Sequence, residues 1–327
     1  MARDDAHTVD ETPDISPALS GCSRGGVTFW KLSTAGLATR RAVARALLLL
    51  AASAAPVGCA TLGPSADELA DQAVSVRVMS FNIAAGHGDL PRIAEVIRAS
   101  GAEIVGLQEV DVHWGDRSGF VDQATWLAGA LDMGVFFAPI YTFPPADGRL
   151  DERKYGLAIL SRHPIAAATN HSLSRLSTQS DAAVPVPLPG FPCARIEIGG
   201  SAVQVCNTHL DYRSDPTTRR LQVGEMLRII GEGSQPVLLL GDLNAEPDAT
   251  ELGPLFHRLR DAWHSADNGF TYPADTPIKR IDYILASPHF TIDAVEVLSS
   301  DASDHRPVVA DLTLRSEGRQ CRGRPRF

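Results

Sequence analysis

The segment Pro236-Val237-Leu238-Leu239-Leu240-Gly241-Asp242-Leu243-Asn244 decides the fold of this chain. Its first five residues are all apolar, as in a buried β-strand, and two polar side chains follow at the end of that strand. Three other apolar runs end in the same way: 74–81 before Asn82, 104–107 before Glu109 and 202–205 before His209. Polar groups at successive strand ends can converge on one point, so this pattern predicts a single polar site.

Two further motifs add polar groups of the same kind nearer the C-terminus. They read Arg280-Ile281-Asp282-Tyr283 and Ser303-Asp304-His305. Carboxylate and carboxamide oxygens suit a hard divalent cation such as Mg²⁺, and the two imidazoles of the motifs suit proton transfer. The residues themselves therefore indicate a site for a divalent cation with groups for proton transfer beside it.

The motifs in this order resemble the endonuclease/exonuclease/phosphatase superfamily, the DNase I-like metal-dependent phosphoesterases. The resemblance covers residues 75–314, and its most specific pieces are Gly241–Asn244 and Ser303–Pro307. It implies an α/β fold of the α+β type, a four-layer sandwich of two mixed β-sheets flanked by helices. The active site of such a fold is expected at one edge of the sandwich.

The resemblance also implies a catalytic metal ion, Mg²⁺ or Mn²⁺. Asn82 and Glu109 match the family residues that hold this ion, and Asp304 completes the site or supports a second ion. A phosphodiester is hard to hydrolyse, because an anion must accept a nucleophile and then expel a poor leaving group. A metal ion relieves both difficulties by neutralising the phosphoryl oxygens.

The remaining motif residues are expected to carry the catalytic steps. By resemblance His305 is the base or the group that orients the phosphate, and Asp282 is the carboxylate that sets its tautomer. Asp242 and Asn244 would position the attacking water and a phosphoryl oxygen. His209 would serve the leaving-group side as general acid or charge stabiliser.

Three residues are candidates for substrate binding. Tyr155 matches a family position, and Lys279 and Arg280 lie together next to Asp282. Lys279 either draws in a phosphate or is a solvated loop lysine. Asp211 could assist the acid, bind a second cation or be a solvated loop residue.

The sequence favours some classes of substrate over others but does not identify one substrate. His209 favours the DNase I, sphingomyelinase, inositol-phosphatase and deadenylase branches over the abasic endonucleases, and the formal net charge of −9 counts against a non-specific nuclease. The sequence therefore predicts an exported Mg²⁺-dependent phosphoesterase, in particular a phosphodiesterase, whose substrate is a nucleic acid, a phospholipid or a small phosphoester. The alternative is a non-catalytic binding or scaffolding lipoprotein with this fold. No obligate protein partner is evident.

The N-terminal part reads as an export signal. Arg40-Arg41 and Arg45 precede an apolar stretch, and Cys59 follows it as in a bacterial lipoprotein cleavage box, so the protein is either lipid-anchored through Cys59 or simply cleaved. Either outcome places it in the bacterial envelope or outside the cell. The expected organisation is a disordered or mis-assigned extension at 1–37, a signal at 38–58, a linker at 59–73, the phosphoesterase domain at 74–315 and a basic tail at 316–327.

Strand and helix patterns alternate through the predicted domain. Two long loops are expected at 141–155 and 171–192, as binding loops or, for the second, as a surface insertion. Arg219 and Arg220 are weaker candidates for attracting a phosphate, and the favoured interpretation places them on the solvated face of the predicted helix 216–231. The other predicted helices are 90–99, 123–131 and 249–259, and the predicted strands are 74–83, 103–108, 156–160, 193–198, 201–206, 236–240, 281–285, 290–298 and 307–314.

A disulfide is predicted between Cys193 and Cys206. These residues flank a hairpin whose turn is Gly199-Gly200, and counting outward from the turn places them opposite each other at a non-hydrogen-bonded pair. The Cα atoms of such a pair lie about 4.5 Å apart, within the range of a disulfide. We expect the bond on the polar face of the hairpin, with Arg195, Glu197 and Gln204; the alternative is two reduced cysteines.

Overall fold

Residues 73–315, except 87–88, 182 and 265–267, are described by the computed structural model. The expected N-terminal extension, export signal, Cys59, nearly all of the linker and the basic tail lie outside these described residues. None of the helices that the structure describes is both long and apolar enough to cross a membrane.

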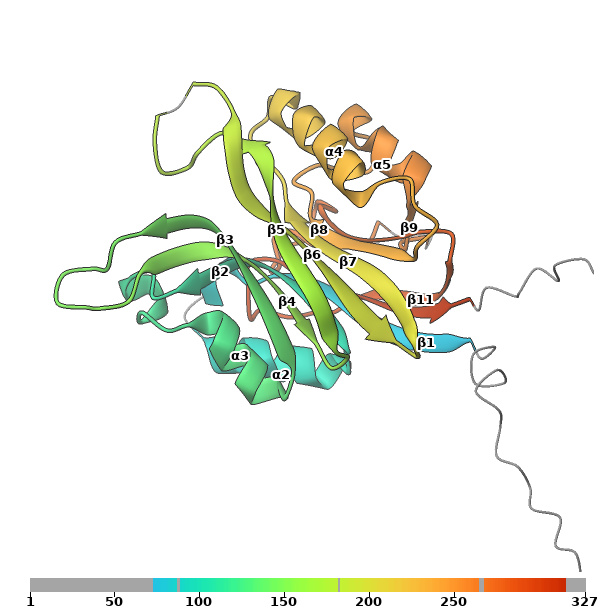
Figure 1. The fold of residues 1–327 in the computed structure, drawn as a ribbon, viewed down its shortest axis with the longest axis horizontal. Coiled ribbons are helices and arrows are strands. Elements are labelled where there is room, and N and C mark those ends of the chain that lie inside the picture. The colour runs from blue at the N-terminus through green and yellow to red at the C-terminus, as the bar shows by residue number, and fades with distance from the viewer. Residues whose placement is uncertain (1–72, 87–88, 182, 265–267, 316–327) are drawn as a thin grey trace, which may run out of the picture. The chain divides into compact units, whose positions relative to one another are not determined.

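Two mixed sheets form the centre of the fold, as the family resemblance implied, and each has six strands (Figure 1). Each sheet has one parallel pair of strands, β1 with β2 and β7 with β8, and its other pairs are antiparallel. The first sheet has the order β11 (Phe290–Val297), β12 (Val308–Leu314), β1 (Val74–Asn82), β2 (Ile104–Val112), β4 (Arg153–Ser161), β3 (Gly134–Phe143). The second has the order β5 (Ile165–Arg175), β6 (Val186–Ile198), β7 (Ser201–His209), β8 (Val237–Asp242), β10 (Asp282–Ala286), β9 (Arg260–Asp261).

Helices cover the outer face of each sheet, which gives four layers. Figure 1 shows α2 (Leu90–Ser100) and α3 (Gln123–Leu131) on one side, and α4 (Thr217–Ile230) and α5 (Gly253–Arg258) on the other. Short 3-10 helices lie at η1 (Ala84–Gly86), η2 (Asp116–Ser118) and η3 (Thr250–Leu252).

Strand β1 illustrates why the central strands are apolar throughout. Val76 and Val78 face the core between the two sheets, whereas Met79 and Phe81 face the core beneath α2 and α3. Successive side chains of a strand point to opposite faces, so a strand with a packed layer on each side needs apolar residues at nearly every position. This is the reason that the apolar runs predicted the buried strands.

The two long loops of the sequence prediction are shorter than expected. Residues 141–143 belong to β3 and 153–155 to β4, so the first loop spans only 144–152. The second region is mostly β5 and the beginning of β6, and its loop spans 176–185. The prediction of a patternless segment at 171–192 was therefore wrong.

The first half of β6 was not predicted as a strand, because its prolines are typical of a loop. Pro187 and Pro192 pair with Ser174 and Asn170 of β5, but β7 pairs with β6 only from Cys193 onward. The prolines therefore lie where β6 has a partner strand on one side alone, and the absent N–H group can face the side without a partner. Proline in such a segment is compatible with a strand even though it resembles a loop in the sequence.

The disulfide between Cys193 and Cys206 is present in the predicted register. The two Cα atoms are 4.1 Å apart, and the strands pair Arg195 with Gln204 as expected. The expectation of a polar environment was wrong, because both cysteines are buried in the core beneath α4, together with Leu173. Arg195 remains exposed on the same face, since α4 covers only one end of the hairpin.

Candidate active site

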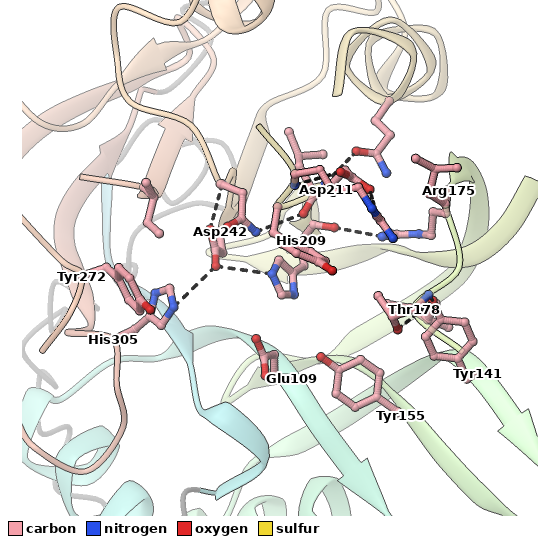
Figure 2. Close-up of a pocket in the computed structure, with 18 of the residues that line it drawn as sticks. Glu109, Tyr141, Tyr155, Arg175, Thr178, His209, Asp211, Asp242, Tyr272 and His305 are labelled. Carbon is pink, nitrogen blue, oxygen red and sulfur yellow. Dashed lines mark hydrogen bonds and ion pairs between the residues drawn. The ribbon is translucent and has the colours of Figure 1, made fainter. Parts of the chain in front are cut away.

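The ends of the parallel strand pairs of both sheets meet around one cavity of about 320 Å³ (Figure 2). Strands β1 and β2 bring the first sheet's residues to this cavity, and β7 and β8 bring those of the second. Seven of the predicted site residues line it: Glu109, Tyr155, His209, Asp242, Asn244, Asp304 and His305. Asn82 and Asp282 are buried directly behind this lining, each bonded to a residue that belongs to it.

Glu109 reaches the cavity because strand β2 is irregular at this point. Gln108 and Glu109 together oppose Leu157 alone in β4, which is a β-bulge, and Glu109 has a left-handed φ of 57°. Gln108 instead points into the protein, where its Nε2 donates to Asn207 Oδ1 at 2.7 Å. The bulge thus separates a structural side chain from one that faces the cavity.

Asn82 connects the carboxylates of the two sheets. Its Nδ2 donates to Glu109 Oε1 at 3.2 Å and to Asp242 Oδ2 at 3.1 Å, while its Oδ1 accepts from the backbone N–H of Ala84 at 3.1 Å. The backbone oxygen of Asn82 accepts from Ser303 Oγ at 2.8 Å. Asn82 therefore holds Glu109, Asp242 and the segment before His305 in fixed relative positions.

His305 and Asp282 form a buried pair. The His305 Nδ1 atom lies 2.9 Å from Asp282 Oδ2, and the Tyr272 ring packs against the imidazole at a centroid distance of 4.7 Å. Burial alone would lower the pKa of His305, but the negative charges of Asp282, Asp242 and Asp304 raise this pKa to about 10. Without a bound cation, the imidazole is therefore protonated at neutral pH.

Asp242 lies at the centre of the site. Its Oδ1 accepts from the backbone N–H of Asn244 at 2.8 Å, and its Oδ2 lies 3.4 Å from His209 Nε2 and 3.8 Å from His305 Nε2. Burial and the neighbouring charge of Asp282 raise the pKa of this carboxyl.

The preceding Gly241 has φ of 157°, and a Cβ atom there would overlap the carbonyl oxygen of Thr208 in β7. Glycine at 241 therefore allows β8 to bring Asp242 alongside β7.

The donor atoms around the cavity suit a divalent cation. Among the described residues, one oxygen or nitrogen atom from each of Asp242, Asp282 and His305 lies within 4.8 Å of the others, and Asp282 Oδ1 is buried without a hydrogen-bond partner. The carboxylates of Glu109 and Asp304 line the same cavity. Four carboxylates at one cavity, two of them buried, fit a hard metal ion.

Two of the predicted substrate-binding residues lie away from the cavity lining. Arg280 is buried, donates to Asp261 Oδ2 at 2.8 Å and lies over the ring of Tyr283, so its charge is already neutralised. Lys279 is exposed on the segment that pairs with Tyr272. Tyr155 does line the cavity, and Figure 2 shows its hydroxyl pointing toward Glu109; burial and the Glu109 charge raise the pKa of this phenol.

Several cavity residues had no motif to mark them. Arg175 is buried in the wall and comes from the region predicted as a patternless loop, so no sequence signal identified it. Asp211, an open candidate in the sequence, lines the cavity and pairs with Arg213 at 2.6 Å. The remaining lining outside the motifs includes Ile140, Leu176, Thr178, Tyr212, Gln222 and Tyr272.

Arg219 also differs from its prediction as a solvated residue of a helix face. Its guanidinium is buried, donates to Glu251 Oε1 from Nε at 3.0 Å and from Nη2 at 2.8 Å, and donates to the backbone oxygens of Asp211 and Arg213. It therefore fixes the segment after His209, while Arg220 is exposed as expected.

The sequence profile of the Endonuclease/Exonuclease/phosphatase family matches residues 79–305, and the chain belongs to this family of metal-dependent phosphoester hydrolases. The match spans β1 to the His305 motif, and therefore the whole candidate site.

Known proteins with related sequence or fold agree with this classification. Protein cwh43 of Schizosaccharomyces pombe is 29% identical over 152 residues, which are 46% of this chain and only 14% of the yeast protein. An endonuclease/exonuclease/phosphatase of Beutenbergia cavernae has a TM-score of 0.59 at 24% identity, over 74% of this chain and 72% of that one.

Two further structures share the fold. The human Nocturnin catalytic domain has a TM-score of 0.57 at 22% identity, over 74% of this chain and 94% of its own. The mannosyl-6-phosphatase of Bacteroides thetaiotaomicron has a TM-score of 0.54 at 21% identity, over 72% and 99%.

Proposed function

We propose that this chain is an exported phosphodiesterase that depends on Mg²⁺ or Mn²⁺. The observation that carries the proposal is the position of Asp242, whose carboxylate is surrounded by Asn82, His209 and His305 in one cavity. Such a group combines a proton acceptor, two imidazoles and nearby metal-binding oxygens, which are the parts that phosphodiester hydrolysis requires.

Glu109 and Asp304 would hold the metal ion, with Asn82 beside them. Both carboxylates line the cavity, and they leave the His305–Asp282 pair intact. A cation bound there would neutralise charge on the phosphoryl oxygens. Asp242, Asp282 and His305 form an alternative set of donors, but a cation bound by His305 Nδ1 would displace the hydrogen bond to Asp282.

The residues of the chain divide the proton transfers between them. Asp242, whose pKa is raised, would accept the proton of the attacking water, while Asn244 helps to hold that water. The His305 imidazolium, oriented by Asp282, would face a phosphoryl oxygen. As the water oxygen bonds to phosphorus and the ester P–O bond breaks, His209 would protonate the departing oxygen.

The proposed substrate is a small phosphoester or a phospholipid head group in preference to duplex nucleic acid. The cavity of about 320 Å³ is suited to a compact group, and the formal net charge of −9 disfavours a polyanion. Export rests on the signal-like sequence at 38–58, and the Cys193–Cys206 disulfide is compatible with an oxidising compartment.

Hydrolysis of bis-p-nitrophenyl phosphate tests the proposal directly. Purified protein should release p-nitrophenol with Mg²⁺ or Mn²⁺ and should lose this activity with EDTA. Glu109→Ala and His305→Ala should each lower kcat at least about 100-fold, since each removes a group that acts on the reacting phosphate. Glu232→Ala, at an exposed position outside the cavity lining, is the matched control and should leave kcat unchanged.

Two results would count against the proposal. If the wild-type protein hydrolyses no phosphodiester with either metal, or if neither cavity variant differs from Glu232→Ala, a non-catalytic binding protein becomes the better account.

A further inference from the structure

The cavity continues past the proposed reaction centre to a second end with a different character. Figure 2 shows His305 and Arg175 on opposite sides of His209. The end near His305 carries the carboxylates of Asp242 and Asp304, whereas the wall at the other end contains a buried guanidinium. We call this second end the Arg175 subsite and define it by Arg175, Gln222, Tyr141 and Thr178.

The positive charge of Arg175 has no carboxylate partner among the described residues. Its Nη1 donates to the backbone oxygen of His209 and its Nη2 to that of Gly190, each at 2.9 Å. Two carboxylates influence it from nearby, but Asp211 is bonded to Arg213 and Glu225 to Ser174. A buried cation without a counter-ion is costly, so its presence in a cavity wall suggests an anionic ligand.

Burial does not remove this charge. Desolvation lowers the pKa of Arg175 to about 10, which still leaves the guanidinium protonated at neutral pH. With one end of the cavity acidic and the other cationic, a ligand could place its metal-binding phosphate at the first end and another anionic group at the second.

Two hydrogen-bond donors in this wall have no acceptor. Arg175 Nε and Gln222 Nε2 are buried and unpartnered among the described residues. Gln222 is held in its orientation because its Oε1 accepts from the backbone N–H of Asp211 at 3.0 Å, so its amide nitrogen is the free group. Buried donors are normally paired, and two unpaired N–H donors, one of them on the uncompensated cation itself, indicate an oxygen-rich anion.

Tyr141 forms the opposite side of the subsite and limits the size of the group that can bind there. Its hydroxyl accepts from the backbone N–H of Thr178 at 2.9 Å, and its ring stacks on that of Tyr155 with centroids 6.2 Å apart. The space between this aromatic wall and Arg175 is part of a cavity of about 320 Å³, which suits a compact anionic group.

We propose that the Arg175 subsite binds a second phosphate group of the substrate, so that the preferred substrates are small phosphoesters with another phosphate beyond the scissile one. This inference rests on the proposed phosphodiesterase function and specifies its substrate class. The second phosphate belongs to a free metabolite or to a lipid head group, and the recognition chemistry is the same for both.

A matched pair of chromogenic substrates tests the proposal. Thymidine 5′-(p-nitrophenyl phosphate) and its 3′-phosphorylated form release the same nitrophenol and differ by one phosphate. The wild-type protein should have a kcat/KM about 10- to 100-fold higher for the 3′-phosphorylated form, the range expected of hydrogen bonds to a charged group. Arg175→Met should remove this preference, and Arg175→Lys should retain part of it. Arg195→Met, at an exposed residue outside this cavity, should keep the full preference.

Equal kcat/KM values for the two substrates in the wild-type protein would overturn the subsite while leaving the phosphodiesterase function intact. The wild-type ratio decides this point even if Arg175→Met fails to fold. If the wild type hydrolyses neither substrate, calorimetric titration of the same protein with thymidine 3′,5′-bisphosphate and thymidine 5′-monophosphate separates the two ideas. Tighter binding of the bisphosphate that is lost in Arg175→Met and partly retained in Arg175→Lys supports the subsite, and equal binding of the two ligands by the wild type rejects it.

Discussion

The side chain of Asp282 forms its hydrogen bond with the imidazole of His305. It is buried, its Oδ2 lies 2.9 Å from His305 Nδ1, and its Oδ1 has no partner among the described residues. A carboxylate in this position fixes the orientation of the imidazole and stabilises its protonated form. Asp282 acts through His305 and is therefore a positioning residue.

Asp282→Asn should lower kcat about 10²- to 10⁴-fold with little change in KM, because the amide keeps the shape of the carboxylate but not its charge. Loss of that charge should also lower the pKa of His305, since Asp282 is the largest of the influences that raise it. Steady-state kinetics and imidazole NMR titration of the metal-free protein measure the two effects.

Asp132→Asn is the matched control for this substitution. Asp132 is exposed after α3 with a left-handed φ of 54°, a conformation that Asn tolerates, so the variant should keep both kcat and the His305 pKa. An unchanged His305 pKa in Asp282→Asn would show that the 2.9 Å contact does not stabilise the imidazolium.

Motif residues were predictable one by one, because each follows an apolar run or carries a family motif. Glu109 and Asp242 were placed at strand ends by this pattern and do line the cavity. Arg280 shows the limit of such reasoning, since adjacency to Asp282 in sequence does not reveal that its guanidinium pairs with Asp261. Arg175 shows the converse limit, because its position depends on how β5 folds back against β6.

At the scale of single elements, helix α4 contributes a buried ion pair that supports the segment after β7. Arg219 and Glu251 are both buried, and the guanidinium also donates to the backbone oxygens of Asp211 and Arg213. This contact connects α4 and η3 to the residues that follow His209. No sequence pattern indicated this pair, because its two residues are separated by 32 positions.

Glu251→Gln should lower the free energy of unfolding by about 3–5 kcal/mol, because it leaves the Arg219 charge buried without its carboxylate. Urea denaturation followed by circular dichroism measures the change. Glu232→Gln, at an exposed position next to α4, should remain within about 0.5 kcal/mol of the wild type. Equal unfolding free energies for the two variants would mean that water or another group compensates Arg219.

Regular elements were predicted well where both faces are packed, and irregular ones were not. The helix at 123–131 has the predicted bounds, and β1 ends within one residue of its prediction. The bulge at Glu109 and the strand pairing of Pro187 follow from contacts with β4 and β5. Local sequence does not specify such partners, which is why β2 and β6 extend beyond their predicted bounds and β5 was not predicted as a strand.

At the scale of the whole molecule, the site exists only because two sheets pack face to face. Asn82 and Glu109 come from the first sheet, and His209 and Asp242 from the second. The family resemblance predicted this architecture, but the contacts that set the spacing of the sheets were not predictable. One of them is Asn207 of β7, whose Nδ2 donates to the backbone oxygens of Leu107 and Ala158 in the first sheet, each at 2.9 Å.

Gly106 of β2 lies close to β7 and β8 of the second sheet, so a substitution there tests how the spacing of the sheets affects catalysis. A Cβ atom at this position would lie 2.9 Å from Leu240 Cβ and 3.0 Å from Asn207 Oδ1. Both neighbours are buried in close-packed surroundings, so neither side chain can easily move away from an added methyl group. Gly106→Ala should therefore lower the free energy of unfolding by about 1–3 kcal/mol, as overpacking of a core does.

The same substitution should also reduce kcat, because forcing Leu240 away moves Asp242, two residues later on β8, relative to Glu109 on β2. Gly129→Ala in α3 is the matched control, because the added Cβ would have no atom within 4 Å apart from those of its own helix. Alanine also favours a helix, so the stability of this variant should rise slightly while its kcat stays constant. Denaturation curves and hydrolysis rates of both variants measure these effects. If Gly106→Ala lost stability but kept full kcat, the spacing of the sheets would matter for folding alone, and the positions of Asp242 and Glu109 would depend on their local hydrogen bonds through Asn82.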